Sequence, residues 1–115
     1  MRTAALIALL LLAGCRAPES LLLGVAPIET PQSTVRAMLT EKHTAPLRLQ
    51  GTIVEKCPVS GCWFRLKDDS GTVLVDLKPA GLTAAEIPVG TKVMAVGTVQ
   101  REGDALRLRA TGIRY

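Results

Sequence analysis

Aromatic residues are scarce in this chain: among its 115 residues it has one tryptophan, one phenylalanine and one tyrosine. Its core must therefore be aliphatic, built from Val, Leu, Ile and Met. The chain also has a single histidine, His43. A lone histidine without a partner acid or nucleophile is not a catalytic signal, and we find no paired carboxylates, phosphate loop or oxyanion arrangement. We expect a protein that is not an enzyme and holds no cofactor.

A strong excess of one charge is missing as well. The formal net charge is +4, and it falls to +3 without Arg2. That is far from the dense basic clustering of a dedicated nucleic-acid binder. Nucleic acid is therefore not the partner that we expect.

The first 14 residues have the layout of a cleavable secretory signal. Arg2 supplies a short positive region, and residues 4–12 are uncharged and apolar. That run is too short to span a bilayer, which takes about 20 residues. We predict a signal peptide over residues 1–14. An ordinary signal with an incidental cysteine, or an N-terminal membrane helix, is the alternative.

The tetrapeptide Leu12-Ala13-Gly14-Cys15 resembles the bacterial lipobox. The resemblance implies cleavage before Cys15, a thioether-linked diacylglycerol on its sulfur, and fatty acyl groups such as palmitate. It also implies a lipoprotein of the bacterial cell envelope, anchored to the membrane by lipid, with its folded part on the periplasmic side. Arg16 stands where an aspartate often marks inner-membrane retention, which favours the outer membrane.

We divide the mature chain into a lipid-anchored tether, residues 15–31, and one domain, residues 32–115. Proline and glycine recur through the tether and disfavour a long helix or strand. The apolar run at residues 21–23 is odd for a solvated linker; it lies either on the membrane or on the domain. Residues 32–42 predict a short helix with one apolar stripe, capped by Thr30 or Ser33. The stripe consists of Val35, Met38 and Leu39.

From residue 47 onward the hydrophobic period is two, which is typical of half-buried strands. Five strands are predicted, over residues 47–54, 63–67, 72–77, 92–100 and 105–110. We expect a helical turn at residues 82–87, a bent first strand at Gly51 and a bulge or bend at Gly97. This order predicts an all-β, five-stranded OB-fold-like Greek-key barrel. An open two-layer sheet is the alternative.

Three stretches, residues 49–54, 64–77 and 96–99, resemble the periplasmic BOF proteins and the wider tRNA anticodon-binding-like OB group. They carry a Leu-x-Gly-x-Ile strand, an Asp-x-x-Gly hairpin and a late Val-x-Gly-x-Val-like strand. The Cys-x4-Cys-Trp segment ending at Trp63 departs from BOF proteins and is similar to an uncharacterised group of small secreted OB-like proteins. The resemblance implies the fold and assigns no catalytic residue.

The two cysteines of that segment, Cys57 and Cys62, have three readings. An oxidising compartment favours a disulfide that braces the loop between the first two strands. A soft-metal site for copper or zinc is the second reading, and it would need His43, Met38 or Met94 to complete its ligands. A redox-active dithiol is the third, although the spacing is not Cys-x-x-Cys.

Five residues are candidates for a ligand face: Trp63, Arg65, Lys67, Arg107 and Arg109. We expect Trp63 to fill the barrel, with Phe64 on the opposite side; the alternative places Trp63 outside, near the loop mouth where OB-folds commonly hold ligands. The basic residues are solvated strand positions, a nucleic-acid groove or a contact to lipid headgroups. We expect a non-enzymatic binding module for an envelope protein, a small ligand or a metal. A thiol-based metal or redox protein is the alternative, and a nucleic-acid-binding domain a further one.

Overall fold

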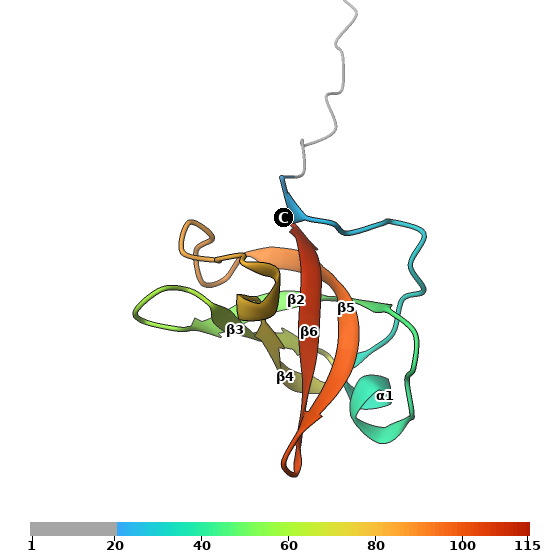
Figure 1. Ribbon diagram of the computed structural model, residues 1–115. Coiled ribbons are helices and arrows are strands. Elements are labelled where there is room, and N and C mark those ends of the chain that lie inside the picture. Colours follow the sequence, from blue (N-terminus) through green and yellow to red (C-terminus); the bar gives the residue numbers. More distant parts are fainter. Residues whose placement is uncertain (1–20) are drawn as a thin grey trace, which may run out of the picture.

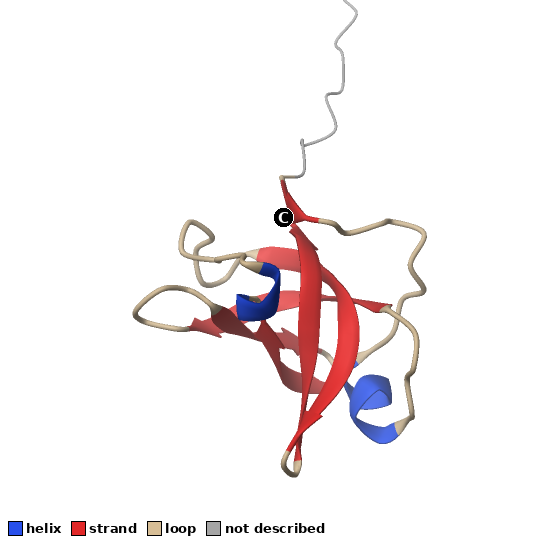
Figure 2. Ribbon diagram, in the orientation of Figure 1, coloured by secondary structure: helices blue, strands red, loops and turns tan. Residues whose placement is uncertain are grey.

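The computed structural model describes residues 21–115, and in them a six-stranded sheet closes into a barrel (Figures 1 and 2). The strands are β1 (Leu22–Gly24), β2 (Leu47–Lys56), β3 (Trp63–Asp68), β4 (Gly71–Asp76), β5 (Lys92–Glu102) and β6 (Ala105–Arg114). Their order is β1-β6-β4-β3-β2-β5, and β5 also pairs with β6. That last pairing closes β2 to β6 into the expected five-stranded OB-fold barrel.

Two irregularities let so small a sheet curl. β2 pairs with β5 through its first half and with β3 through its second, and its register with β3 shifts between Ile53 and Glu55. β5 has a register shift against β6 between Val96 and Gly97. Bulges of this kind bend a strand and increase its twist. The predicted bend at Gly97 is therefore confirmed.

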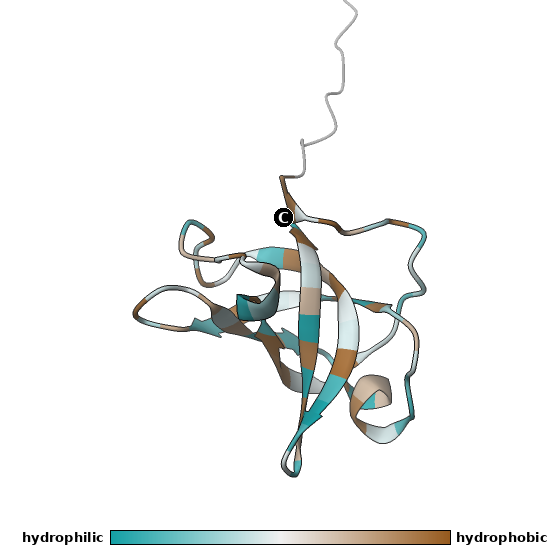
Figure 3. Ribbon diagram, in the orientation of Figure 1, coloured by the Kyte–Doolittle hydropathy of each residue, from teal (hydrophilic) through white to brown (hydrophobic). Residues whose placement is uncertain are grey.

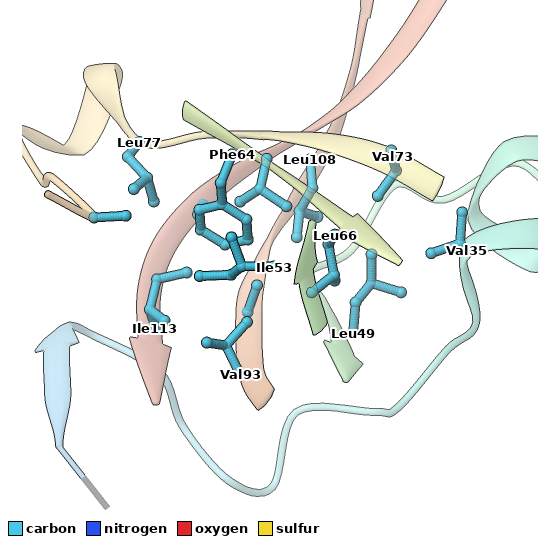
Figure 4. Close-up of a cluster of buried hydrophobic side chains, with 14 of the residues drawn as sticks. Val35, Leu49, Ile53, Phe64, Leu66, Val73, Leu77, Val93, Leu108 and Ile113 are labelled. Carbon is cyan, nitrogen blue, oxygen red and sulfur yellow. The ribbon is translucent and has the colours of Figure 1, made fainter. Parts of the chain in front are cut away.

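The core is aliphatic and is centred on one aromatic ring. Phe64 is fully buried, and Figure 4 shows it among Ile53, Leu77 and Leu108. The expectation that Trp63 fills the barrel is wrong, since Trp63 is only half-buried. Neighbours on a strand face opposite sides, and Phe64 lies two residues from the inward Leu66. Trp63 must therefore face outward.

The predicted helix is shorter than its pattern. α1 spans Val35–Thr40, and the Thr34 hydroxyl caps it by accepting a hydrogen bond from the Ala37 N–H. Val35 and Met38 are fully buried, but Leu39 is 40% exposed. The helix packs at the end of the barrel where β3 turns into β4 (Figure 1).

Asp68 ties α1 to that turn. Its carboxylate accepts hydrogen bonds from the Val35, Ser70 and Gly71 N–H groups and from the Ser70 hydroxyl, at 2.6–3.1 Å. Partial burial raises the pKa of Asp68, but the Ser70 hydroxyl and the three N–H groups outweigh burial and hold the pKa below its ordinary value. One turn residue thus positions both the hairpin and the start of the helix.

In the connection from β4 to β5, the helical segment lies closer to β4 than predicted. A short 3-10 helix, η1, spans Lys78–Ala80 and ends at Gly81, which has a left-handed φ of 68°. Pro79 favours this early start, since proline suits the first helical positions. The predicted helical turn at residues 82–87 is only a turn, in which the Thr83 hydroxyl accepts a hydrogen bond from the Ala85 N–H.

The described part of the expected tether is bound to the barrel. β1 pairs antiparallel with β6, Leu23 packs against the core and Ala26 is buried. The apolar run at residues 21–23 therefore lies on the domain, because it adds a strand beside β6. The predicted signal peptide and Cys15 lie outside the described residues. Within residues 21–115, no helix has the length and apolar character needed to cross a bilayer.

Candidate functional site

Polar and apolar residues alternate along the barrel strands (Figure 3). Since successive side chains of a strand face opposite sides, those that avoid the core lie on the outside of the barrel. On β3, β4 and β6 the residues Leu66, Val75 and Leu108 are buried, and their neighbours point away. We call the following set the outer face: Trp63, Arg65, Lys67, Leu74, Asp76, Arg107 and Arg109. All five predicted ligand-face residues belong to it.

Strand register arranges the outer face in rows. Trp63 lies opposite Asp76 of β4, which in turn lies opposite Arg109 of β6. In the next row Leu74 of β4 separates Arg65 from Arg107. Directly opposed side chains of a sheet are close enough to interact. The half-buried Leu74 thus lies between two guanidinium groups at the centre of the face.

Carboxylates offset much of the positive charge. Arg65 Nε lies 3.2 Å from Glu55 Oε2. Arg107 lies 3.5 Å from Asp76 Oδ2 and 2.6 Å from Glu102 Oε2. The exposed Arg65–Glu55 pair contributes about 0–1 kcal/mol to stability. Both arginines of the outer face thus already have carboxylate partners within the protein.

Two cations of the outer face are in no ion pair within residues 21–115: Lys67 and Arg109. Both are exposed. A carboxylate on a partner would therefore find its free cations here, at two separated points of the face. The face as a whole carries mixed charge and no continuous basic groove.

Trp63 is the aromatic side chain of the outer face. Arg65 Cζ lies 5.9 Å from its ring centroid, which is within the range of a cation–π contact. The two residues are two apart on β3, so they lie side by side on the same surface. Tryptophan and arginine together are over-represented among the residues that dominate protein–protein binding energy.

Cys57 and Cys62 flank the loop between β2 and β3, and both are free thiols in this structure. The Cys57–Cys62 disulfide stays a prediction, and the Cys57 Sγ atom lies 4.0 Å from the Ser60 hydroxyl oxygen. The N–H groups of Ser60 and Val59, together with the Cys62 thiol and the Ser60 hydroxyl, lower the pKa of the Cys57 thiol from 9.0 to about 6.

His43 does not complete a metal site with these sulfurs. Its Nε2 atom lies 3.1 Å from the Ala37 carbonyl oxygen, in the connection after α1. Over residues 21–115, no three His, Cys, Asp or Glu residues come together in a metal-binding group. The zinc alternative therefore lacks the ligands that it needs among these residues.

A polar groove of about 610 Å³ opens next to Lys67. Residues 32–34, the middle of β2, the end of β3 with the turn after it, and Lys92 at the start of β5 line it. The turn contributes Asp68 and Asp69. Asp68 is already committed to α1 and to the turn. The groove's cations and carboxylates balance, so it extends the mixed-charge character of the outer face.

Sequence reasoning missed the residues that shape the outer face between the arginines. Leu74 and Asp76 come from β4, and the alternation of Val73, Val75 and Leu77 already places them on the outer side. Glu55 and Glu102 are different: only the strand register brings them to Arg65 and Arg107. No sequence signal gives that register.

Comparison with solved structures places the chain among OB-folds. It is similar to the hypothetical protein ygiW from E. coli, with a TM-score of 0.55 and 24% identity over 71% of this chain and 86% of that one. It is also similar to a chain of the S. pombe Stn1-Ten1 complex, with a TM-score of 0.52 and 19% identity over 70% and 75%. No family model and no curated protein matches the sequence. The likeness defines an OB-fold protein.

Proposed function

We propose that this protein is a lipid-anchored, non-enzymatic binding module of the bacterial envelope, and that its outer face binds another envelope protein. The observation that carries the proposal is the convergence of Trp63, Leu74 and the arginines on one surface. Such residues supply large apolar area beside fixed charge, which is the composition of binding hot spots. The OB-fold is a frequent scaffold for binding on this side of its sheet.

The same face argues against a nucleic acid. Single-stranded binders stack successive bases on several aromatics along a basic groove. On the outer face only Trp63 is available, since Phe64 points into the core. Glu55, Asp76 and Glu102 would also repel a phosphate chain. A partner with an apolar socket for Trp63 and carboxylates for Lys67 and Arg109 fits better.

Substitution of Trp63 tests this function. A photo-crosslinking amino acid at the exposed Thr72, in the full-length chain in its membrane, is expected to give one discrete protein adduct. Trp63→Ala is expected to lower the adduct yield by about 10-fold or more, as truncation of a hot-spot residue does. Leu39→Ala removes an exposed side chain from α1 and is the matched control, with no expected change.

Two outcomes would refute the proposal. An adduct yield that Trp63→Ala leaves unchanged would show that the outer face does not carry the contact. An adduct that nuclease destroys would favour the nucleic-acid alternative instead. Gel mobility and mass spectrometry of the adduct distinguish these results.

Membrane attachment rests on the sequence and on the position of the first described residues. Leu21, Leu22, Val25 and Ile28 are 48–67% exposed. The six residues from Cys15 to the start of this segment span at most about 20 Å. A lipid on Cys15 would therefore bring these apolar side chains within reach of the bilayer surface, where they add to the affinity of the anchor.

Replacing the anchor residue tests the attachment. Cys15→Ser is expected to abolish incorporation of a labelled fatty acid and to move the protein from the membrane fraction to the soluble one, since a single acyl-bearing residue carries the anchor. Labelling in growing cells followed by fractionation measures both. Label retained by the serine variant would contradict the proposal.

A further inference from the structure

The loop between β2 and β3 is held in place at both of its cysteines. The Cys57 N–H donates to the Trp63 carbonyl at 3.0 Å, and the Cys62 carbonyl accepts from the Leu77 N–H at 2.9 Å. In between, the Gly61 carbonyl accepts from the Ala84 N–H at 2.8 Å. The two sulfurs are therefore carried on a fixed frame, unlike cysteines in a free surface loop.

Gly61 is required for this backbone conformation of the loop. Its φ is +64°, and a Cβ atom there would lie 2.6 Å from the Ala85 backbone nitrogen. Lys56 binds the same segment, since its ammonium donates to the Ala84, Ala85 and Ile87 carbonyls at 2.6–3.3 Å. The loop is thus packed against residues 84–87. Its turn places the backbone N–H groups of Val59 and Ser60 near the Cys57 sulfur.

A cavity of about 300 Å³ opens at Cys57. Its lining includes Pro58, Val59 and Val89, and the last two are 91% and 56% exposed. Apolar side chains this exposed offer a contact surface to a molecule that approaches the sulfur. Cys57 itself is half-exposed, so an incoming group can reach it.

We propose that Cys57 and Cys62 form a thiol–disulfide exchange site, with Cys57 as the attacking sulfur and Cys62 as the resolving one. The substrate class is a disulfide, either in a small thiol compound or on an exposed protein segment that fits the cavity. This activity is separate from partner binding on the outer face.

The exchange balances in two steps. The Cys57 thiolate attacks one sulfur of the substrate disulfide, forming a mixed disulfide while the other sulfur leaves with the bonding electron pair. The Cys62 thiol then passes its proton to that leaving thiolate, and the resulting Cys62 thiolate attacks the Cys57 sulfur. The mixed disulfide breaks, and its substrate sulfur leaves with the bonding electron pair and takes a proton from water. A Cys57–Cys62 disulfide forms, and the substrate has gained two electrons and become two thiols. The reverse sequence oxidises a substrate dithiol.

The surroundings of Cys57 favour exchange over a permanent brace. Hydrogen bonds from Ser60, Val59 and Cys62 stabilise its thiolate, and a stabilised thiolate makes the corresponding disulfide easier to reduce. A structural disulfide needs no such donors, because neither of its sulfurs carries charge. The predicted Cys57–Cys62 disulfide therefore becomes one of two working states of the loop.

Glutathione disulfide is the probe for the test. The reduced full-length protein is mixed with glutathione disulfide, and mass spectrometry of peptides follows each cysteine separately, so that Cys15 does not interfere. The wild-type protein is expected to form the Cys57–Cys62 disulfide and release two glutathione thiols. The Cys62→Ser variant is expected to stop at one glutathione adduct on Cys57. The Cys57→Ser variant is expected to react with glutathione disulfide at least about 10-fold more slowly than the wild type.

Alkylation by iodoacetamide between pH 4 and pH 9 supplies a second readout that does not depend on glutathione. The rate at Cys57 is expected to reach half its maximum near pH 6. Equal rates for Cys57→Ser and Cys62→Ser with glutathione disulfide would overturn the proposal. So would a loop disulfide that excess reduced glutathione does not open, because the pair would then be a structural brace. A melting curve for each variant verifies that it is folded.

Discussion

Phe64→Ala is expected to destabilise the barrel by roughly 3–5 kcal/mol and to lower the Tm by about 15 °C or more. Phe64 is fully buried and is the largest fully buried side chain among residues 21–115. The side chains around it in Figure 4 are aliphatic and buried, and a close-packed interior relaxes only partly into the space that a removed ring leaves. Thermal melting followed by circular dichroism measures the change.

The adjacent residue supplies the control. Trp63 is larger than Phe64 but lies on the outer face, so Trp63→Ala is expected to cost less than about 1.5 kcal/mol. An equal loss of stability in the two variants would contradict the assignment of Trp63 to the outside. It would also remove the anchor of the proposed partner-binding surface.

Much of the barrel follows from alternation alone. The five predicted strands and the tight turn at residues 68–71 are present, because half-buried strands need a hydrophobic period of two and Asp, Ser and Gly suit a hairpin turn. The side on which Trp63 lies was also within reach: Phe64 and Leu66 are two apart and share a face. Because aromatic residues are scarce, composition alone places the larger ring, that of Trp63, in the core. The alternation of side chains along the strand places Phe64 there instead.

Other features depend on contacts between distant segments. The pairing of β1 with β6 joins residues about 90 positions apart, and only the odd apolar run at residues 21–23 hints at it. The helix begins at Val35, later than predicted, where Asp68 and Ser70, far along the chain, accept hydrogen bonds from the N–H groups of its first turn. A local pattern cannot encode either contact.

In the candidate site, too, some features follow from alternation along the strands and others depend on contacts between distant segments. Alternation predicts that Arg65, Lys67, Arg107 and Arg109 point outward together. It does not predict that Leu74 lies between the arginines, because that depends on the pairing of β4 with β6, far along the chain. It also does not predict that three carboxylates pair with the arginines. For the cysteine loop, spacing argued against redox chemistry, whereas the N–H groups that stabilise the thiolate come from the folded turn.

Gly97→Ala is expected to cost about 3 kcal/mol or more, or to prevent folding. A Cβ atom at Gly97 would lie 2.1 Å from the Arg109 carbonyl oxygen and 2.8 Å from the Ala110 Cα. These are backbone atoms of β6, at the bulge where β5 pairs with both β2 and β6, so no side chain can move aside. Urea unfolding of the variant and the wild type measures the difference.

Gly81→Ala separates this steric cost from the cost of backbone conformation. Gly81 has a φ of +68° and nothing within 4 Å of a built Cβ, so alanine there is expected to cost only about 1 kcal/mol. Arg109, whose carbonyl opposes Gly97, also ends the row that begins at Trp63. A folded Gly97→Ala protein should therefore lose partner crosslinking as well as stability. If it unfolds like the wild type, the backbone of β6 accommodates a Cβ atom at Gly97 without cost, and the close packing of β5 against β6 at this bulge is wrong.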